Sequence, residues 1–260
     1  MALPPILFHH FATPLPYRQT LRLQESIHAL QLQQRRASGS HRDILLLLQH
    51  RPVYTGGRRQ TDSEVALDRA RLADVGADFV LTQRGGQLTY HGPGQIVGYP
   101  LLDLSRTAPA MGIREYICRM QKVLTLHLRE AHGIVPAESE HTGVFLDAAT
   151  KVGSIGVQVR HRLTSHGFAF NVTREPHAWF DEIVACGLED VRAGSIESAT
   201  AATLALEAEI PGVAERFGRV YERDMESLDA SKEGELGELI SALEAEAEKA
   251  GPWHTAPSHP

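Results

Sequence analysis

Apolar and polar positions follow two spacings along this chain, which predict both strands and helices. Asp43 to His50 is an almost unbroken run of Ile and Leu, which is typical of a strand buried on both faces. Residues 113–132 place apolar side chains on one stripe at helical spacing, and Gly133 then ends the pattern. The chain therefore combines buried strands with amphipathic helices.

The same patterns predict the remaining elements. We expect strands at 6–11, 79–82, 143–147, 151–160 and 163–172, and helices at 17–36, 63–76, 212–226 and 233–249. Because strands and helices do not alternate regularly, their order favours an α+β fold over a doubly wound sheet. The composition shifts to Ala, Glu and Leu at about residue 199, which predicts a helical C-terminal extension over 199–250, and we expect 251–260 to be disordered.

Composition and charge argue against several classes of function. The 260 residues carry a formal charge of −6 with a pI near 6.2, which argues against general nucleic-acid binding. No apolar run approaches the roughly 18 residues that cross a bilayer, and we expect neither a secretory signal nor a transit peptide. Two cysteines, Cys118 and Cys186, cannot form a disulfide framework and suit a reducing compartment. We expect Cys118 to be a small core side chain of the helix at 113–132.

A stretch rich in glycine and proline, Arg84 to Gln95, follows the strand at 79–82 and precedes another apolar run at 96–102. Glycine permits a close approach of the backbone to a ligand, and proline removes a donor and fixes φ. Two interpretations stay open from the residues alone. The stretch is either an ordinary hairpin turn or a loop whose N–H groups and polar side chains bind a ligand.

Two later stretches complete a set of ordered motifs. The string KVGSIG at 151–156 leads to TSHG at 164–167 and to Asn171, and Cys186-Gly187 follows. In this order and spacing, they and the stretch at 84–95 resemble the lipoyl(octanoyl) transferase family, over roughly residues 7–197. The resemblance implies a single catalytic domain at 6–198 with the fold of biotin and lipoate ligases, in which helices flank a mostly antiparallel sheet.

The resemblance implies that Cys186 is a nucleophile and that Lys151 is its partner. On its own, Cys186 would more often be structural, and Lys151 would be a solvated charge on a hairpin. A thiol with the ordinary pKa of about 8.5 is only a few per cent ionised at neutral pH, and a nearby ammonium favours the thiolate. The sequence departs from the family at Ala185, where proline is usual, and we expect this to loosen the loop without removing the nucleophile.

The resemblance also implies an acyl-binding site. Its residues are Arg84, Gly85, Gly86, Gln87, Leu88, Thr89, Tyr90, His91, Ser154, Ile155, Gly156, Gly167, Phe168 and Ala169. Small residues there leave room for a straight apolar chain, and backbone N–H groups are suited to an oxyanion hole. Phe168 stands where the family usually has leucine, so we expect a pocket of different shape. His91 and His166 are candidates for orienting groups, and without the resemblance each would be a structural histidine.

The expected activity is that of a lipoyl(octanoyl) transferase, an acyltransferase of protein lipoylation. The resemblance implies octanoyl acyl carrier protein as the donor, and lipoyl domains of 2-oxoacid dehydrogenase E2 subunits and the glycine cleavage H protein as acceptors. A thioester is already activated, so we expect no ATP, metal or other cofactor, and no His-Glu-x-x-His, Cys-x-x-Cys or P-loop pattern is present. Arg58, Arg59, Arg84, Arg160 and Arg162 either form a basic rim for acidic partners or are ordinary solvated side chains.

Two rival functions remain open from the sequence. An ATP-dependent lipoate or biotin ligase would share the fold and a lysine, but it normally carries an Arg-Arg-x-x-Gly-Gly-Gly string and needs no cysteine nucleophile. A catalytically inactive binding module would not need the pair of Lys151 and Cys186. Family members work in the bacterial cytoplasm or in mitochondria. The acidic C-terminal extension favours a mitochondrial protein, whereas the N-terminus without a leader favours the cytoplasm, and we expect the mitochondrion of the two.

Overall fold

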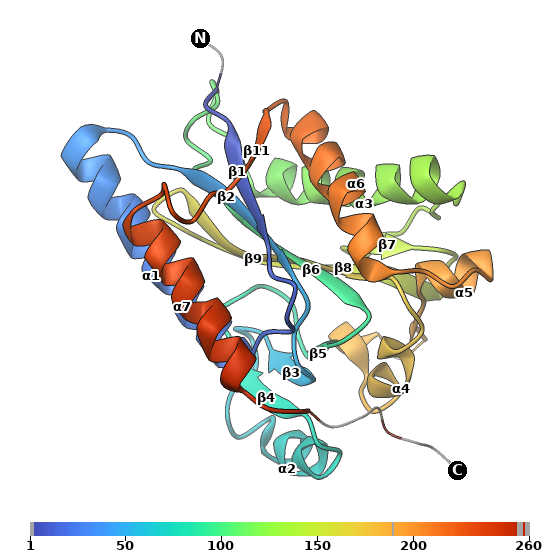
Figure 1. Cartoon of the computed structure of the whole chain (residues 1–260). Coiled ribbons are helices and arrows are strands. Elements are labelled where there is room, and N and C mark those ends of the chain that lie inside the picture. The colour runs from blue at the N-terminus through green and yellow to red at the C-terminus, as the bar shows by residue number, and fades with distance from the viewer. Residues whose placement is uncertain (1–2, 189, 254–256, 258–260) are drawn as a thin grey trace.

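Two β-sheets form the centre of the molecule (Figure 1). The computed structural model describes residues 3–188, 190–253 and 257, apart from the side chain of Cys186. The large sheet contains β1 (Ile6–His10), β2 (Asp43–Leu48), β6 (Gln95–Leu101), β7 (Val144–Phe145), β8 (Thr150–Arg160), β9 (Leu163–Asn171), β10 (Arg192–Ala193) and β11 (Met225–Ser227). Its order is β10-β8-β9-β6-β2-β1-β11, and β7 pairs with β8 outside this path.

The large sheet is mixed in direction. Its central pairs, β8–β9, β9–β6 and β6–β2, are antiparallel, as expected. The outer pairs, β10–β8, β2–β1 and β1–β11, are parallel, which the sequence did not indicate. This mixed sheet, flanked by helices, confirms the α+β prediction.

The small sheet carries the glycine-rich stretch. Its order is β4-β3-β5, from β3 (Val53–Gly56), β4 (Asp78–Leu81) and β5 (Thr89–His91). The strands β4 and β6, which flank the stretch, lie in different sheets, and β5 within it pairs antiparallel with β3. The stretch is therefore not a hairpin turn between its flanking strands, and the first of the two interpretations was wrong. It instead links the small sheet to the large one.

Helices cover both faces of the large sheet (Figure 1). They are α1 (Tyr17–Ser38), α2 (Ala66–Asp74), α3 (Ile113–His132), α4 (Pro176–Phe180), α5 (Ile196–Thr200), α6 (Leu206–Tyr221) and α7 (Glu235–Lys249), with a 3₁₀ helix η1 (Ala185–Gly187). Side chains of α1 and α7 share one core cluster, whereas those of α3 and α6 share another. None of the described helices is long and apolar enough to span a membrane.

The strand β2 separates these two cores. Its six residues are all buried, as the run of Ile and Leu predicts. Leu45 and Leu47 face the core under α3 and α6, while Ile44, Leu46 and Leu48 face the core under α1 and α7. Because successive side chains of a strand point to opposite faces, an uninterrupted apolar run fills both layers at once.

The C-terminal extension differs from its predicted form. The helix α6 begins at Leu206, earlier than expected, and contains Pro211. The burial of its apolar face outweighs the backbone hydrogen bond that proline cannot make. The helix ends at Glu222, which has a left-handed φ of 57°, and residues 225–227 form β11 instead of continuing the helix. The predicted disorder of 251–260 falls mostly on residues outside the described part of the chain.

The helix α3 has its predicted bounds, but its buried stripe is rotated from the one expected. Ile113 is 51% exposed, whereas Tyr116 and His127 are buried. Cys118 is exposed, so the prediction that it is a core side chain was wrong. The reason is geometric, since residues 116, 120, 123, 124, 127 and 128 define the face that meets the sheet and residue 118 points away from it.

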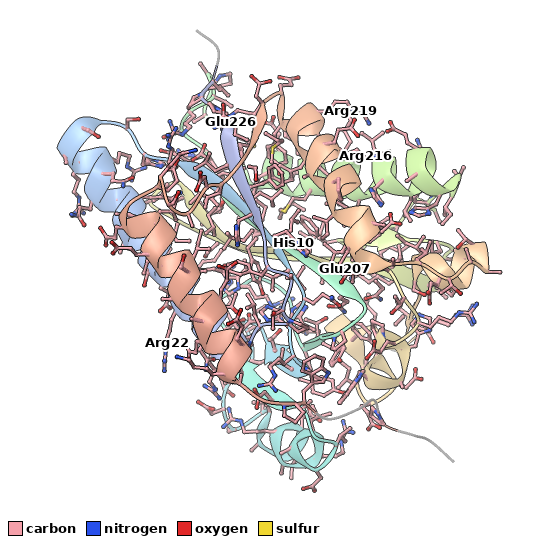
Figure 2. All side chains as sticks on the ribbon, in the orientation of Figure 1. His10, Arg22, Glu207, Arg216, Arg219 and Glu226 are labelled. Carbon is pink, nitrogen blue, oxygen red and sulfur yellow. The ribbon has the colours of Figure 1, made fainter. Side chains whose placement is uncertain are left out.

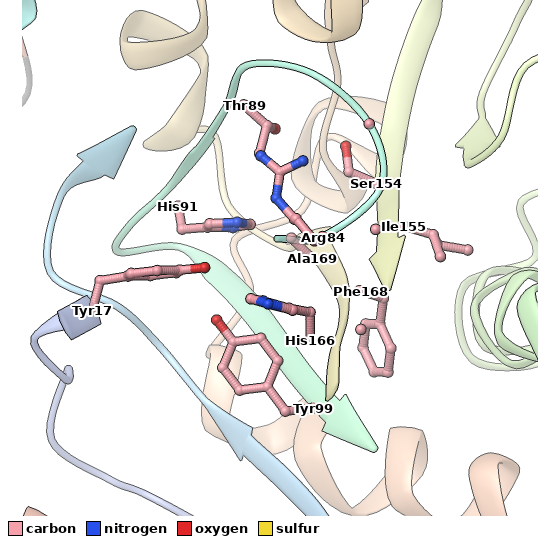
Figure 3. Close-up of a pocket in the computed structure, with 13 residues that line it drawn as sticks. Tyr17, Arg84, Thr89, His91, Tyr99, Ser154, Ile155, His166, Phe168 and Ala169 are labelled. Carbon is pink, nitrogen blue, oxygen red and sulfur yellow. The ribbon is translucent and has the colours of Figure 1, made fainter. Parts of the chain in front are cut away.

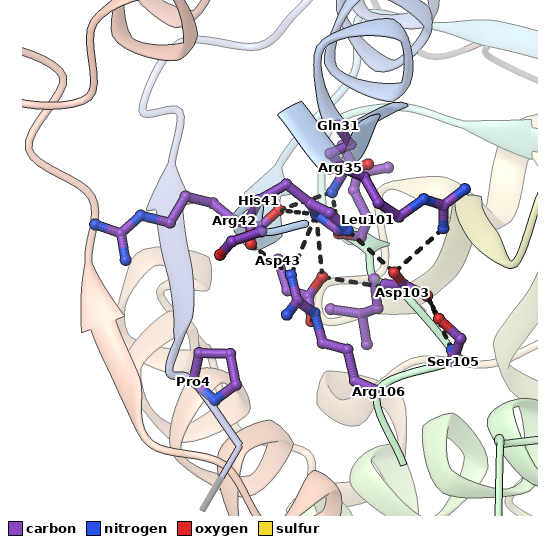
Figure 4. Close-up of polar contacts among 12 residues, drawn as sticks. Pro4, Gln31, Arg35, His41, Arg42, Asp43, Leu101, Asp103, Ser105 and Arg106 are labelled. Atoms are coloured by element: carbon purple, nitrogen blue, oxygen red, sulfur yellow. Dashed lines mark hydrogen bonds and ion pairs between the residues drawn. The ribbon is translucent and has the colours of Figure 1, made fainter. Parts of the chain in front are cut away.

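A buried carboxylate, Asp43, ties the extension to the core, and a second, Asp103, lies beside it (Figure 4). Asp43 on β2 forms ion pairs with Arg106 at 3.0 Å and with Arg223, just after α6, at 2.8 Å. Asp103, after β6, hydrogen-bonds with His41 at 3.0 Å. Removing one partner from such a buried pair leaves an uncompensated charge and is strongly destabilising. The cluster therefore fixes the chain after α6 against β1 and β2.

Candidate active site

The edge strand β10 brings the Cys186 segment to Lys151. Ala193 of β10 is paired in register with Lys151 of β8, and Gly194 donates its N–H to the Lys151 carbonyl oxygen at 2.8 Å. The turn η1, with Cys186 at its centre, precedes this strand by a few residues. Ala185, Lys151 and Ala193 line one cavity. The fold thus brings together two segments that lie 35 positions apart in the sequence.

Lys151 is buried, with 8% of the residue exposed, and is not a solvated hairpin charge. Its Nζ lies 5.4 Å from the centre of the Phe145 ring, to which it is opposed across β7 and β8. This distance allows a cation–π contact between the Lys151 ammonium and the ring. A Cβ at Gly143 would lie 2.5 Å from Cε of Lys151, so a side chain at Gly143 would displace the lysine.

The backbone of Cys186 forms the middle of η1, while its side chain lies outside the described part of the chain. The next residue, Gly187, has a φ of 68°, which favours glycine. A Cβ there would lie 2.1 Å from Oε1 of Gln87. Gln87 belongs to the glycine-rich stretch, so this stretch packs directly against the turn that carries Cys186.

Arg84 holds the glycine-rich stretch in shape. It is 5% exposed, and its Nη2 donates to the Thr55 carbonyl oxygen at 2.6 Å, to the Thr55 hydroxyl at 2.8 Å and to the Gln87 carbonyl oxygen at 2.9 Å. Gly85 donates its N–H to the Val157 carbonyl oxygen of β8 at 2.9 Å. Arg84 is therefore an internal support of the site, and the hypothesis that it belongs to a basic surface rim was wrong.

A cavity lies between this stretch and the strands β6, β8 and β9 (Figure 3). It is lined by Tyr17, Arg84, Gly86, Thr89, His91, Tyr99, Ser154, Ile155, Gly156, His166, Gly167, Phe168 and Ala169. Most residues expected to bind an acyl group are among them. Tyr17 and Tyr99 were not expected, because neither belongs to a recognisable motif and Tyr17 fits the apolar stripe predicted for the helix at 17–36.

Four of the expected residues lie outside this cavity. Gly85 and Gln87 line an adjoining groove, and Leu88 lines a third hollow together with Gln87. Tyr90 is fully buried in a separate aromatic cluster, where its ring stacks on Trp179 at 5.2 Å. Tyr90 therefore supports the loop from behind and does not face the cavity.

Buried histidines and tyrosines form one wall of the cavity (Figure 3). The Tyr17 and His91 rings lie parallel, with their centres 6.1 Å apart. Behind them, His50 hydrogen-bonds through Nε2 with the Tyr99 hydroxyl at 2.6 Å. His166 has a left-handed φ of 58°, and its Nδ1 has no hydrogen-bond partner within the described residues. Backbone strain of this kind is concentrated at functional sites.

Burial keeps these imidazoles uncharged. It lowers the pKa of His50 to about 4 and that of His166 to about 3. It also lowers the pKa of His91 well below the ordinary value, and repulsion from His50, when that ring is protonated, and from the Arg84 guanidinium adds to this effect. At neutral pH the wall therefore presents neutral rings and hydroxyls.

Three hollows meet along β8. Ser154 borders both the cavity described above and the one that reaches Lys151 and Ala185. Lys151 also borders a groove lined by Arg58, Arg59 and Arg160. The short segment 151–156 is thus the junction between the cavity at the glycine-rich stretch, the turn of Cys186 and the basic groove. Such a junction can hold a chain in the cavity and present its end to groups that arrive through the groove.

Comparisons with known proteins agree with this geometry. Residues 16–218 match the model of the lipoyl protein ligase A/B catalytic domain family. The octanoyltransferase of Koribacter versatilis is 36% identical over 193 residues, which cover 73% of this chain and 76% of that protein. The octanoyltransferase of Caldicellulosiruptor bescii is 35% identical over 219 residues, which cover 83% of this chain and 92% of that protein. This chain belongs to the octanoyltransferase family.

Membership makes the chain an acyltransferase of that family and disfavours the two rival functions. The solved structures that resemble this chain have low sequence identity to it, so they show a shared fold and nothing about its activity. Lipoate-protein ligase A bound with ATP matches with a TM-score of 0.66 and 15% identity over 97% of this chain and 98% of the ligase. A bipartite lipoate protein ligase of Thermoplasma acidophilum matches with a TM-score of 0.65 and 16% identity over 96% of this chain and 93% of that one.

Proposed function

We propose that this chain transfers an octanoyl group from acyl carrier protein to a lysine of a lipoyl domain, through a thioester on Cys186. Family membership supports the octanoyl group and the two kinds of partner. The observation that carries the mechanism is the pairing of β10 with β8, which places the Cys186 turn and buried Lys151 at one cavity. A lysine in that position can stabilise a thiolate and exchange protons with the groups that enter.

The first half-reaction acylates the enzyme. The Cys186 proton passes to the Lys151 amine, and the thiolate attacks the thioester carbonyl of the donor. The new carbon–sulfur bond forms as the bond to the carrier's sulfur breaks, and the carrier thiolate takes a proton from the Lys151 ammonium. Backbone N–H groups of the glycine-rich stretch are suited to stabilise the oxyanion.

The second half-reaction forms the amide. The acceptor's neutral amine attacks the acyl-cysteine carbonyl, a carbon–nitrogen bond forms, and Cys186 leaves as a thiolate. The neutral Lys151 amine takes the proton that the new amide nitrogen loses. Both steps use an activated thioester, so the reaction proceeds without ATP, a metal ion or another cofactor.

The cavity is suited to the acyl chain. The rings of His91 and His166 in its wall, and of His50 behind it, are uncharged at neutral pH because burial lowers the pKa of each. Glycine and alanine on the opposite side leave space, since Gly156, Gly167 and Ala169 have little or no side chain. An octanoyl chain can therefore enter without lying against a charged imidazole.

The open groove is suited to acidic protein partners. Arg58, Arg59 and Arg160 are exposed at its edge, and Lys151 lies at its inner end. Positive side chains there attract a carrier protein or a lipoyl domain of opposite charge. The acceptors in this proposal are the lipoyl domains of 2-oxoacid dehydrogenase E2 subunits and the glycine cleavage H protein. The octanoyltransferases compared above are bacterial, which supports a bacterial cytoplasm over a mitochondrion.

Intact-mass analysis tests the covalent step. The protein is incubated with octanoyl acyl carrier protein, without ATP or acceptor. We expect a single octanoyl adduct on the wild type and on Cys118→Ser, which removes the other, exposed cysteine, and no adduct on Cys186→Ser. A lipoyl domain should then release the adduct. An adduct on Cys186→Ser, or acceptor modification only with ATP and free octanoate, would refute the proposal.

A further inference from the structure

Three metal-ligating side chains converge between α3 and α6. His127 and His132 come from α3, and Glu209 comes from α6. Nε2 of His127 lies 2.7 Å from Oε2 of Glu209, and Nε2 of His132 lies 2.9 Å from the same oxygen. The ligand atoms of the three residues all lie within 4.8 Å of one another. The group is separate from the acyl cavity, because none of its members lines that cavity.

The group lies next to the apolar part of the interface between α3 and α6. Ile210, Val213 and Phe217 of α6 belong to the same core cluster as the buried face of α3. The His127 side chain is only 1% exposed, and its ring packs edge-on against Phe170, with the centres 5.8 Å apart. A carboxylate in such surroundings is unfavourable unless it is paired. An ordinary interface would place apolar residues at all of these positions.

Nearby arginines do not neutralise Glu209. Arg216 and Arg219 lie on α6 where it crosses α3 (Figure 2), and both form ion pairs with Glu130, at 3.1 Å and 2.6 Å. The described partners of the Glu209 carboxylate are the two imidazoles. Two imidazole nitrogens and one carboxylate oxygen therefore converge on one place.

We propose that His127, His132 and Glu209 form a binding site for a divalent transition-metal ion of the zinc type, which joins α3 to α6. Two histidines and one glutamate are an established donor set for zinc, with a fourth position left for water. Calcium and magnesium prefer oxygen ligands and do not suit two imidazoles. The side chains of His132 and Glu209 are each 10% exposed, so an ion and its water can reach the group from solvent.

The nitrogen–oxygen distances indicate how the three side chains must move when an ion binds. Ligand atoms that each lie about 2.0–2.1 Å from a tetrahedral ion are roughly 3.3 Å apart. The two nitrogen–oxygen distances here are 2.7 Å and 2.9 Å. The imidazoles and the carboxylate therefore have to separate by a few tenths of an ångström. His132 is the last residue of α3 and can make that adjustment without moving the buried part of the helix.

The surroundings of His127 limit the affinity. Its Nδ1 has no hydrogen-bond partner among the described residues, and a Cβ at Gly212 would lie 3.2 Å from its Cε1. Histidines that bind metals normally donate their second N–H to an acceptor, and loss of such a partner weakens binding about 10–100-fold. We therefore expect an ion that exchanges and that a chelator removes. The site holds the C-terminal extension to the core and takes no part in acyl transfer.

Zinc binding by chelator-treated full-length protein tests the proposal. Titration calorimetry with zinc chloride should show one ion per chain, and zinc should raise the melting temperature. His132→Gln and Glu209→Gln should weaken zinc affinity at least about 100-fold, since each removes one of three ligands. His161→Asn is the matched control, because His161 is exposed, lies outside the group and has a positive φ that Asn tolerates.

Cobalt gives a readout that does not depend on the variants' folding. The wild type with Co²⁺ should show the visible absorption of a four- or five-coordinate nitrogen and oxygen site, without a thiolate charge-transfer band. A thiolate band would assign the metal to a cysteine and overturn the proposal. So would the absence of zinc binding to the wild type, or equal zinc affinity in Glu209→Gln and the wild type. In those cases the group is only a hydrogen-bonded clamp.

Discussion

Gly194 donates its backbone N–H to the carbonyl oxygen of Lys151 at 2.8 Å. This hydrogen bond extends the parallel pairing of β10 with β8, in which Ala193 lies beside Lys151. The proposed lysine is thus fixed by sheet register, and the turn of Cys186 reaches it as the chain enters the edge strand. A site built on paired strands is held more rigidly than one built from loops alone.

Lys151 should contribute to the reaction by transferring protons, and not only by its positive charge. Lys151→Arg keeps a positive charge but cannot accept a proton at neutral pH. We expect it to slow both half-reactions, because each passes a proton through the Lys151 amine, and to transfer the octanoyl group to the acceptor about 10²–10⁴ times more slowly than the wild type. Lys151→Met should be slow in both steps. Rapid-quench mass analysis measures the two steps separately, and a melting curve checks the fold. Transfer by Lys151→Arg within a few-fold of the wild-type rate would remove the proton-transfer role.

The exposed arginines of the groove should act through charge. Replacing Arg58 and Arg59 with glutamate should raise KM for the carrier protein, with little change in kcat, because the partners would repel one another before they meet. The effect should shrink as salt screens the charges. Arg36→Glu, at the exposed end of α1, is the matched control. Equal KM values for both variants at low salt would leave the groove without a docking role.

Acid should destabilise the protein through its buried histidines. Burial lowers the pKa of His50 to about 4 and that of His166 to about 3, whereas both take up a proton at about pH 6.5 in the unfolded chain. Between these values the unfolded state binds more protons, so stability is lost as the pH falls below about 6.5. The loss is on the order of 3 kcal/mol for His50 alone.

Urea unfolding at pH 7 and pH 4.5 measures this loss. Carboxylates also contribute to acid unfolding, so the comparison is between variants. His166→Asn should lose less stability between the two pH values than the wild type, because one of the groups that must stay neutral is gone. If His166→Asn and the wild type lose the same free energy of unfolding between the two pH values, protonation of His166 does not contribute to the acid destabilisation.

Phe168 and Gly98 should be energetically coupled. A Cβ at Gly98 would lie 2.2 Å from Cζ of Phe168, so Gly98→Ala overpacks the core by about 1–3 kcal/mol. Phe168→Leu restores the smaller residue that the family usually carries and should make room for the new methyl group. In a double-mutant cycle by urea unfolding, the two changes together should destabilise less than the sum of the two alone. Additive effects would mean that the ring moves aside without strain.

The elements that the sequence predicted best are those with long, uniform patterns. The run of β2, the full length of α3 and the pair β8–β9 were all predicted close to their observed bounds. The short strands β5 and β11 have three residues each and no periodicity to detect. Their pairing is decided by partners far away in the chain, and local propensity carries no such information.

The residues of the candidate site likewise fall into two groups, those that belong to local sequence motifs and those that only the folded chain brings together. Residues in contiguous motifs, such as Arg84 and His166, could be singled out from the sequence. Tyr17, His50 and Tyr99 come from separate elements, and they meet only when the strands and α1 pack together. The histidines of the proposed metal site are five positions apart, and Glu209 lies 82 positions from His127, so no spacing rule connects them.

The parallel pairing of β1 with β11 has a consequence for how the chain is made. Ile6 and Phe8 are paired in register with Met225 and Ser227, which lie close to the end of the chain. On a ribosome, the first strand therefore leaves the exit tunnel long before its partner is synthesised. Until then its edge carries unpaired N–H and C=O groups that can bind other nascent chains. The edge of β1 is covered only after translation has passed residue 227. Chains that stop earlier therefore expose this unpaired edge, which chaperones and proteases of the cell can recognise.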